Sequence, residues 1–299
     1  MILIVTDNDV SDVTGGLERA AKKFGVWLES IDYVNFYTAK NLLLNRALSR
    51  DCVILLVGHR SMSILAFAFY CALMRRKFSW CPFWHDYKLE GKKGLRFGLY
   101  DLVFKFALSF SKHHFVVSNY EKINTGTRAP QYIVRLPGFI DDKVESGRSS
   151  KSSTRNIDML FVGRDVPHKQ RGHAQKIADQ LDLRYVEVIP GEGHISDVQL
   201  SNAYQNTKVV FIPSMYESYS LVAVEALLAG AVVVAFPNVL VGEGLHKLSR
   251  FVVVSEDDML PALESEVGCW RPVSTEENIF IRHYFSNDNC KKLFLSFFK

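Results

Sequence analysis

The sequence predicts an α/β protein of two domains, each built on a parallel sheet covered by helices. Short apolar runs alternate with amphipathic stretches in the first half, and the same alternation restarts after residue 156. Between the two series, residues 141–156 read DDKVESGRSSKSSTRN, a polar segment that cannot contribute to a core. With 299 residues, 48% of them hydrophobic, the chain is long enough for two separate cores.

The first half contains four apolar runs that predict strands, at residues 2–6, 52–58, 78–84 and 113–118. A helix should begin just after Gly15 and Gly16, because apolar side chains then recur at helical spacing: Leu17, Ala20, Ala21, Phe24, Trp27 and Leu28. Residues 95–110 predict another helix, apolar on every face. Such a helix lies either in a core or in a membrane interface, and the sequence leaves both alternatives open.

The second half predicts strands at residues 157–163, 208–213 and 232–236. The first two are each followed by a helix, one with Ala174, Ile177, Ala178 and Leu181 on a single face, the other spanning about 220–229. Gly230 stands where that second helix would end in a left-handed cap. A terminal helix with Ser286 as N-cap presents an apolar stripe that must dock on another surface: Cys290, Leu293, Phe294, Phe297 and Phe298.

Composition indicates a cytoplasmic protein. The five cysteines are widely spaced and form no CxxC pair, which is typical of reduced thiols in the cytosol. No run reaches the ~18 apolar residues of a spanning helix, and the opening run MILIVTD is too short for a signal peptide.

Charge is distributed unevenly along the chain. Residues 1–150 hold 21 Lys and Arg against 14 Asp and Glu, whereas the remainder holds 15 against 18. A basic first half attracts anionic lipid, phosphorylated glycan or nucleic acid. We do not expect nucleic acid as a partner, because the basic residues do not cluster with the aromatics that single-strand binding needs. An anionic membrane surface, on the inner face of the cytoplasmic membrane, remains a candidate partner.

The segment PSMYESYSLVAVEALLAG carries the strongest indication of chemistry. It places Glu217 before a helix and Glu225 a little over one turn inside it. If Ser220 and Leu221 open the helix, their free N–H groups and the positive end of the helix dipole lie beside Glu217, which suits phosphate and sugar oxygens. The alternative is structural: Glu217 caps the helix and Glu225 lies on its solvated face.

This segment, with its ExxxxxxxE spacing, resembles the signature of the family 4 glycosyltransferases, also called glycosyl transferases group 1. Three further segments resemble the family in the right order. VGRDVPHK is similar to the part in which an Arg and a Lys, here Arg164 and Lys169, grip the donor diphosphate. TGGLERA resembles the glycine donor loop, with Gly15 and Gly16, and FWHDY places His85 like the cleft histidine of the family.

The resemblance implies a GT-B fold, in which two Rossmann-like domains face each other across a cleft. The first domain would span residues 1–145 and the nucleotide-sugar domain 146–283, with a helix at 284–299 crossing back to the first domain. Two departures stand out: LPGFID has Gly where the family usually has Asn, and residues 186–200 are shorter than the usual two strands and connection. Part of the nucleotide-base pocket would then be trimmed.

The resemblance also implies a retaining transfer that needs no metal and no cofactor. Arg164 and Lys169 would stabilise the leaving diphosphate. Glu217 would hold the donor sugar and Glu225 the ribose, while His85 would orient the reacting sugar. The donor-binding set would be completed by backbone groups at Gly15, Gly16, Ser220 and Leu221.

The expected activity is sugar transfer from a nucleotide-diphosphate sugar to a glycan or lipid-linked acceptor, in assembly of a bacterial surface polysaccharide or lipopolysaccharide. A UDP-sugar is the first choice of donor, with GDP- and dTDP-sugars as alternatives. Two other functions fit the same fold: a nucleotide-sugar epimerase, and a carbohydrate-binding protein without catalysis.

Overall fold

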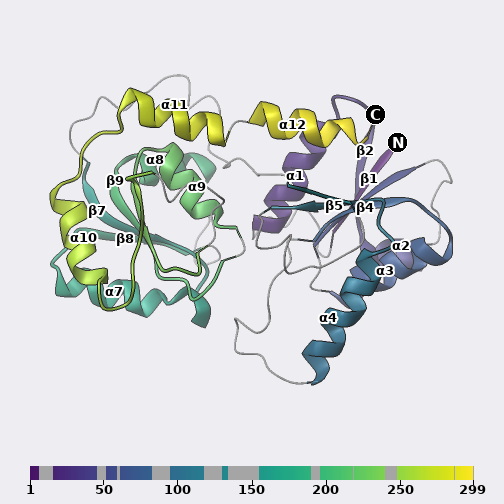
Figure 1. Cartoon of the computed structure of the whole chain (residues 1–299), viewed down its shortest axis with the longest axis horizontal. Coiled ribbons are helices and arrows are strands. Elements are labelled where there is room, and N and C mark those ends of the chain that lie inside the picture. The colour runs from purple at the N-terminus through teal and green to yellow at the C-terminus, as the bar shows by residue number, and fades with distance from the viewer. Residues whose placement is uncertain are drawn as a thin grey trace. The chain divides into compact units, whose positions relative to one another are not determined.

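The computed structural model describes residues 1–6, 16–45, 52–58, 61–82, 95–117, 130–133, 155–189, 196–217, 219–239, 248–285 and 287–298. The chain divides into two compact units (Figure 1). Unit 1 comprises Met1–Leu136 together with Asn287–Lys299, and unit 2 comprises Pro137–Ser286. The last helix therefore belongs to unit 1.

Unit 1 is built on a parallel sheet with strand order β2-β1-β3-β4-β5-β6. The strands are β1 (Ile2–Thr6), β2 (Val34–Thr38), β3 (Val53–Val57), β4 (Phe78–Cys81), β5 (His113–Val116) and β6 (Gln131–Ile133). β1, β3 and β4 are almost wholly buried, because helices cover both faces of the sheet. The four strands predicted for this half are present.

Helices α2 (Ala39–Asn45), α3 (Met62–Leu73) and α4 (Leu95–Leu108) pack on one face of this sheet, around a core that includes Trp80 and Phe104. Helices α1 (Gly16–Leu28) and α12 (Asn287–Ser296) lie on the other (Figure 1). Phe294 of α12 is fully buried, stacking on Phe24 of α1 at 4.7 Å between ring centroids and contacting Phe115 of β5 at 5.0 Å.

Unit 2 has a second parallel sheet, ordered β11-β10-β9-β7-β8. Its strands are β7 (Ile157–Val162), β8 (Tyr185–Val188), β9 (Thr207–Ile212), β10 (Val232–Ala235) and β11 (Phe251–Val253). On one face α7 (Arg171–Gln180) and α10 (Met259–Gly268) enclose a core with Ile177 and Leu263. Helices α8 (Asp197–Gln205), α9 (Leu221–Leu228) and α11 (Thr275–Tyr284) lie on the other (Figure 1). This is an α/β fold with two Rossmann-like units.

Candidate functional site

The candidate site lies at the carboxyl edge of the unit 2 sheet, where the strand order reverses. The chain passes from β7 outward to β8, then returns to place β9 on the other side of β7. The connections that follow β7 and β9 therefore leave the sheet in opposite directions. Ligands of open parallel sheets bind at such a switch point.

Lys169 and Glu217 meet at this point from the two connections. Lys169 is the last residue of a short 3-10 helix, η1 (Pro167–Lys169), that follows β7, and Glu217 follows β9. The Nζ atom of Lys169 forms an ion pair with Oε1 of Glu217, and Ser214 Oγ donates to the same oxygen at 3.0 Å. Both charged side chains are largely buried, with 16% and 15% of their surface exposed.

This ion pair leaves groups available for a ligand. In the part of the chain that the structure describes, Oε2 of Glu217 accepts no hydrogen bond, and the Lys169 ammonium has only one partner. An ammonium has three N–H donors and a carboxylate has two acceptor oxygens. The pair can therefore fix its own geometry and still bind both an anion and a hydroxyl group.

Helix α9 begins beside Glu217, as predicted from the sequence. Ser220 is its N-cap, and its hydroxyl accepts a hydrogen bond from the N–H of Ala223 at 3.3 Å. The N–H groups of Leu221 and Val222 precede the first N–H that donates within the helix, that of Val224 to the carbonyl of Ser220, and they donate to no other group among the described residues. They add to the positive end of the helix dipole, which favours anionic ligands.

Glu225 lies in the second turn of α9 and is 2% exposed. The alternative of a solvated surface glutamate is therefore wrong for this residue. A carboxylate is rarely buried to this extent without a specific role, because removing it from water is costly.

Arg164 follows β7 and is exposed. Its guanidinium has no partner within the described part of the chain. A Cβ atom at the neighbouring Gly163 would lie 3.2 Å from Phe161 Cζ, a tight contact, and 3.7 Å from Lys169 Cδ, an ordinary one. The structure thus brings Lys169 and Glu217 together and leaves the Arg164 side chain unengaged.

A stacked aromatic pair joins the two connections. His168 and Tyr216, the residues just before Lys169 and Glu217, have ring centroids 4.9 Å apart with an interplanar angle of 16°. The backbone N–H of Met215 also donates to the carbonyl of His168 at 2.8 Å. The sequence does not predict this contact, because nothing in the spacing of the two segments shows that they lie side by side.

A second charged group borders the same edge of the sheet. Arg171, the first residue of α7, binds Glu187 of β8 through Nε and NH2 and Asp165 through NH1. These contacts with Arg171 lower the pKa of Glu187. The network joins the start of α7 to β8, the single described strand in the region where the family resemblance leads one to expect two.

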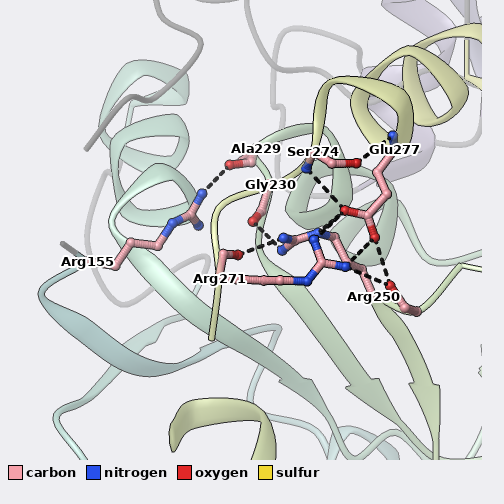
Figure 2. Close-up of polar contacts among 8 residues, drawn as sticks. Arg155, Ala229, Gly230, Arg250, Arg271, Ser274 and Glu277 are labelled. Atoms are coloured by element: carbon pink, nitrogen blue, oxygen red, sulfur yellow. Dashed lines mark hydrogen bonds and ion pairs between the residues drawn. The ribbon is translucent and has the colours of Figure 1, made fainter. Parts of the chain in front are cut away.

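Two buried arginines fix α9 from its other end, at the amino edge of the sheet (Figure 2). Arg155 donates to the carbonyl of Ala229 at 2.7 Å, and Arg250 to that of Gly230 at 3.1 Å. Each guanidinium donates to a carbonyl at the C-terminal end of α9, and its positive charge interacts favourably with the negative end of the helix dipole. Burial lowers the pKa of Arg155 to about 10, so the group is charged at neutral pH.

Three predicted site residues, Gly15, Gly16 and His85, belong to the first half of the chain. Gly15 and His85 lie outside the described residues. Gly16 is the first residue of α1 in unit 1, at the helix start where the sequence places it.

Comparison with known proteins gives a specific result for unit 2. Residues 144–258 match the model of the family "Glycosyl transferases group 1". This segment contains Arg164, Lys169, Glu217 and Glu225. The chain carries a glycosyltransferase domain. No curated protein sequence matches the chain.

Solved structures extend the likeness to the whole chain, at the level of its fold. The sucrose-phosphate synthase of Thermosynechococcus elongatus superposes with a TM-score of 0.69 at 12% identity, covering 99% of this chain and 98% of that one. Anabaena Alr3699/HepE, bound to UDP and glucose, gives 0.67 at 14% identity, with 100% and 99% covered. The lipopolysaccharide outer core galactosyltransferase WaaB gives 0.58 at 12%, with 98% and 99% covered. The fold is GT-B.

None of the helices among the described residues combines the length and the hydropathy needed to cross a bilayer.

Proposed function

We propose that the chain is a retaining, metal-independent glycosyltransferase of family 4 that uses a nucleotide-diphosphate sugar. The observation that carries this proposal is the ion pair between Lys169 and Glu217 beside the open end of α9. It places a cation, a carboxylate and free backbone N–H groups at one switch point. The cation and the backbone N–H groups suit a diphosphate, and the carboxylate suits sugar hydroxyls.

In the proposed reaction the bond between the sugar C1 and the diphosphate oxygen breaks, and a bond from C1 to the acceptor oxygen forms on the same face. The acceptor proton passes to the departing phosphate oxygen, so no protein base is required. Lys169 and Arg164 stabilise the negative charge that develops on the diphosphate. The Lys169 ammonium is held by Glu217 before the donor arrives, so little reorganisation is needed.

The remaining site residues bind and orient the donor. Oε2 of Glu217 accepts hydrogen bonds from the hydroxyls of the donor sugar, and Glu225 holds the ribose. The backbone N–H groups at Ser220 and Leu221 bind phosphate and sugar oxygens. Gly15 and Gly16 let the first domain approach the phosphates, and His85 orients the reacting sugar.

We infer a UDP-sugar as the donor, with GDP- and dTDP-sugars as alternatives. UDP is the nucleotide in the similar Anabaena structure. The segment after β8 is short and would trim part of the pocket for the nucleotide base, which keeps the other bases as alternatives. The acceptor is a glycan or a lipid-linked glycan. The likeness to WaaB, a lipopolysaccharide enzyme, supports a role in assembly of a bacterial surface polysaccharide or lipopolysaccharide at the inner face of the cytoplasmic membrane.

Thermal unfolding with a panel of UDP-, GDP-, dTDP- and CMP-sugars tests the donor site first. A ligand that binds the folded state raises the melting temperature by mass action. We expect a shift with one nucleotide and its loss in Glu225→Gln, which preserves side-chain volume. The control Glu264→Gln changes an exposed carboxylate on α10 and should retain the shift. No shift with any nucleotide would favour a carbohydrate-binding protein without catalysis.

Turnover of that donor with an extract of lipid-linked glycans tests catalysis. Lys169→Ala and Glu217→Ala should each lose about a hundredfold or more in kcat, the usual effect of removing one preorganised polar contact with the transition state. Lys176→Ala, an exposed residue of α7, is the matched control and should keep full activity. Full activity in either site variant contradicts the assignment, and donor conversion without an acceptor indicates an epimerase.

A further inference from the structure

Helix α4 exposes an apolar face. Leu95, Leu99, Leu102 and Phe106 recur at intervals of four, three and four residues, so they share one side of the helix. Their exposed fractions are 91%, 58%, 65% and 58%. Among the described side chains of residues 95–103 none is buried, and the fully buried residues of α4 lie in its last turns: Phe104, Ala107 and Leu108.

The apolar face continues beyond α4. Phe106 contacts Phe110 at 5.0 Å and Phe69 of α3 at 6.0 Å between ring centroids. Figure 1 shows α3 and α4 on the same face of the unit 1 sheet, and the two helices pack on each other. The end of α3 adds two more exposed residues. We call the whole set the α3–α4 apolar face: Leu73, Met74, Leu95, Leu99, Leu102, Phe106 and Phe110.

Positive charge lies beside one end of this face, next to Met74 and Phe110. Residues 61–82 and 95–117 contain six Lys and Arg and a single acidic residue, Asp101. That carboxylate is already paired, with Lys105 Nζ at 3.0 Å. Arg75, Lys77 and Lys112 are exposed, and the N–H of Lys112 donates to the carbonyl of Phe78 at 2.7 Å, which brings Lys112 close to Lys77.

We propose that the α3–α4 apolar face inserts into the interface of a bilayer that contains anionic phospholipid. A contiguous set of exposed Leu and Phe side chains is unfavourable in water and marks an interaction surface. A rim of Lys and Arg beside an apolar helix face matches the headgroup and acyl boundary of such a bilayer. This charge selects an anionic lipid surface over a second copy of the same cationic face, which it would repel.

The inference is independent of the proposed reaction, because binding to lipid needs neither donor nor acceptor. It assigns the α3–α4 apolar face as the surface through which the basic first half meets an anionic membrane. For residues 95–110 it combines the two alternatives left open: the last turns of α4 belong to the core, and on this proposal its exposed face meets the membrane.

Flotation of the full-length protein with vesicles tests the proposal. Vesicles of phosphatidylcholine alone are compared with vesicles that also contain phosphatidylglycerol. We expect binding that increases with phosphatidylglycerol and weakens at high salt. The variant Leu99→Gln/Leu102→Gln should lose about tenfold in partitioning, since each leucine contributes through the area it buries. Arg75→Glu and Lys112→Glu should each lose about fivefold or more.

The matched control lies on α1, on the opposite face of the unit 1 sheet. Val26→Gln and Lys22→Glu change an exposed apolar residue and an exposed cation there, and both should bind vesicles like the unmodified protein. Equal losses in these controls, or no binding to phosphatidylglycerol vesicles, would overturn the proposal. So would a dimer in light scattering that Leu99→Gln/Leu102→Gln dissociates, because the face would then be a contact between copies.

Discussion

The imidazole of His168 stacks on the phenol ring of Tyr216, with ring centroids 4.9 Å apart and planes inclined by 16°. The next residue after each is a member of the ion pair, Lys169 and Glu217. The stack therefore joins the two connections at the point where their charged groups meet. We regard His168 as a positioning residue for Lys169.

Replacing His168 tests this relationship. His168→Ala should lower kcat/KM by up to about tenfold, because Lys169 is then less firmly held. This factor corresponds to the free energy of one aromatic pair. His168→Phe keeps a stacking ring and should restore most of the activity. Steady-state kinetics with the donor identified by thermal unfolding provide the measurement, and a His168→Phe variant as impaired as His168→Ala would argue against positioning by the stack.

The ion pair itself predicts non-additive stability. Glu217→Gln and Lys169→Met should each destabilise unit 2 by about 1–3 kcal/mol, because each leaves one largely buried charge unpaired. The double variant should recover part of that loss, since no unpaired charge remains. Urea unfolding of the four proteins gives the coupling free energy, and strictly additive losses would show that the pair contributes no stability.

Glu277 predicts an acid limit to the stability of unit 2. Burial disfavours its ionised form, but hydrogen bonds from Arg271, Ser249 and the backbone of Ser274 lower its pKa to about 2 (Figure 2). The carboxylate therefore contributes stability above its unfolded pKa of about 4.5, and that contribution disappears as the pH falls toward 2.

Because Glu277 and its partner Arg271 are partly exposed to solvent, which screens the interaction, the magnitude is about 1–2 kcal/mol. Unfolding free energies measured between pH 6 and about 2.5 should fall more steeply for the unmodified protein than for Glu277→Gln. Glu276→Gln, an exposed neighbour on α11, should leave the profile unchanged. Parallel profiles for Glu277→Gln and the unmodified protein would contradict the assignment.

We expect that replacing Gly230 destabilises the protein. Its φ of 76° is in the left-handed region, and a Cβ atom there would lie 3.1 Å from NH2 of Arg155 and 3.3 Å from Val273 Cγ1. Gly230→Ala should therefore destabilise the protein by about 1–2 kcal/mol or more. The control Gly268→Ala, at the end of α10 with open space around it, should not destabilise. Thermal unfolding distinguishes the two, and equal melting temperatures would refute the role of Gly230.

Much of the fold follows from sequence pattern. Apolar runs located the buried strands β1, β3, β4 and β5, and the glycine after α9 correctly predicted a left-handed cap. The pattern failed for β2, whose side chains are partly exposed and show no continuous apolar run. It also failed for α3, because apolar residues lie on all sides of MSILAFAFYCAL and leave no helical period to detect.

The candidate site was predictable only in part. Local patterns located Ser220 at the start of α9 and Glu225 inside it, but their surroundings depend on tertiary contacts. The meeting of Lys169 with Glu217 is a contact over 48 residues, so no short window reveals it. The buried arginines at the amino edge are likewise single charged residues in the sequence, and only their carbonyl partners distinguish them from surface cations.

The place of α12 has a consequence for how the chain folds during synthesis. Unit 1 is assembled from two segments, and Phe294 fills a position against Phe24 and Phe115 only after all of unit 2 has been translated. Until then these aromatic rings of the nascent first unit lack their covering helix, whereas unit 2 is continuous and can complete itself first. An intermediate with an ordered second unit and an unfinished first one is therefore the expected order of events.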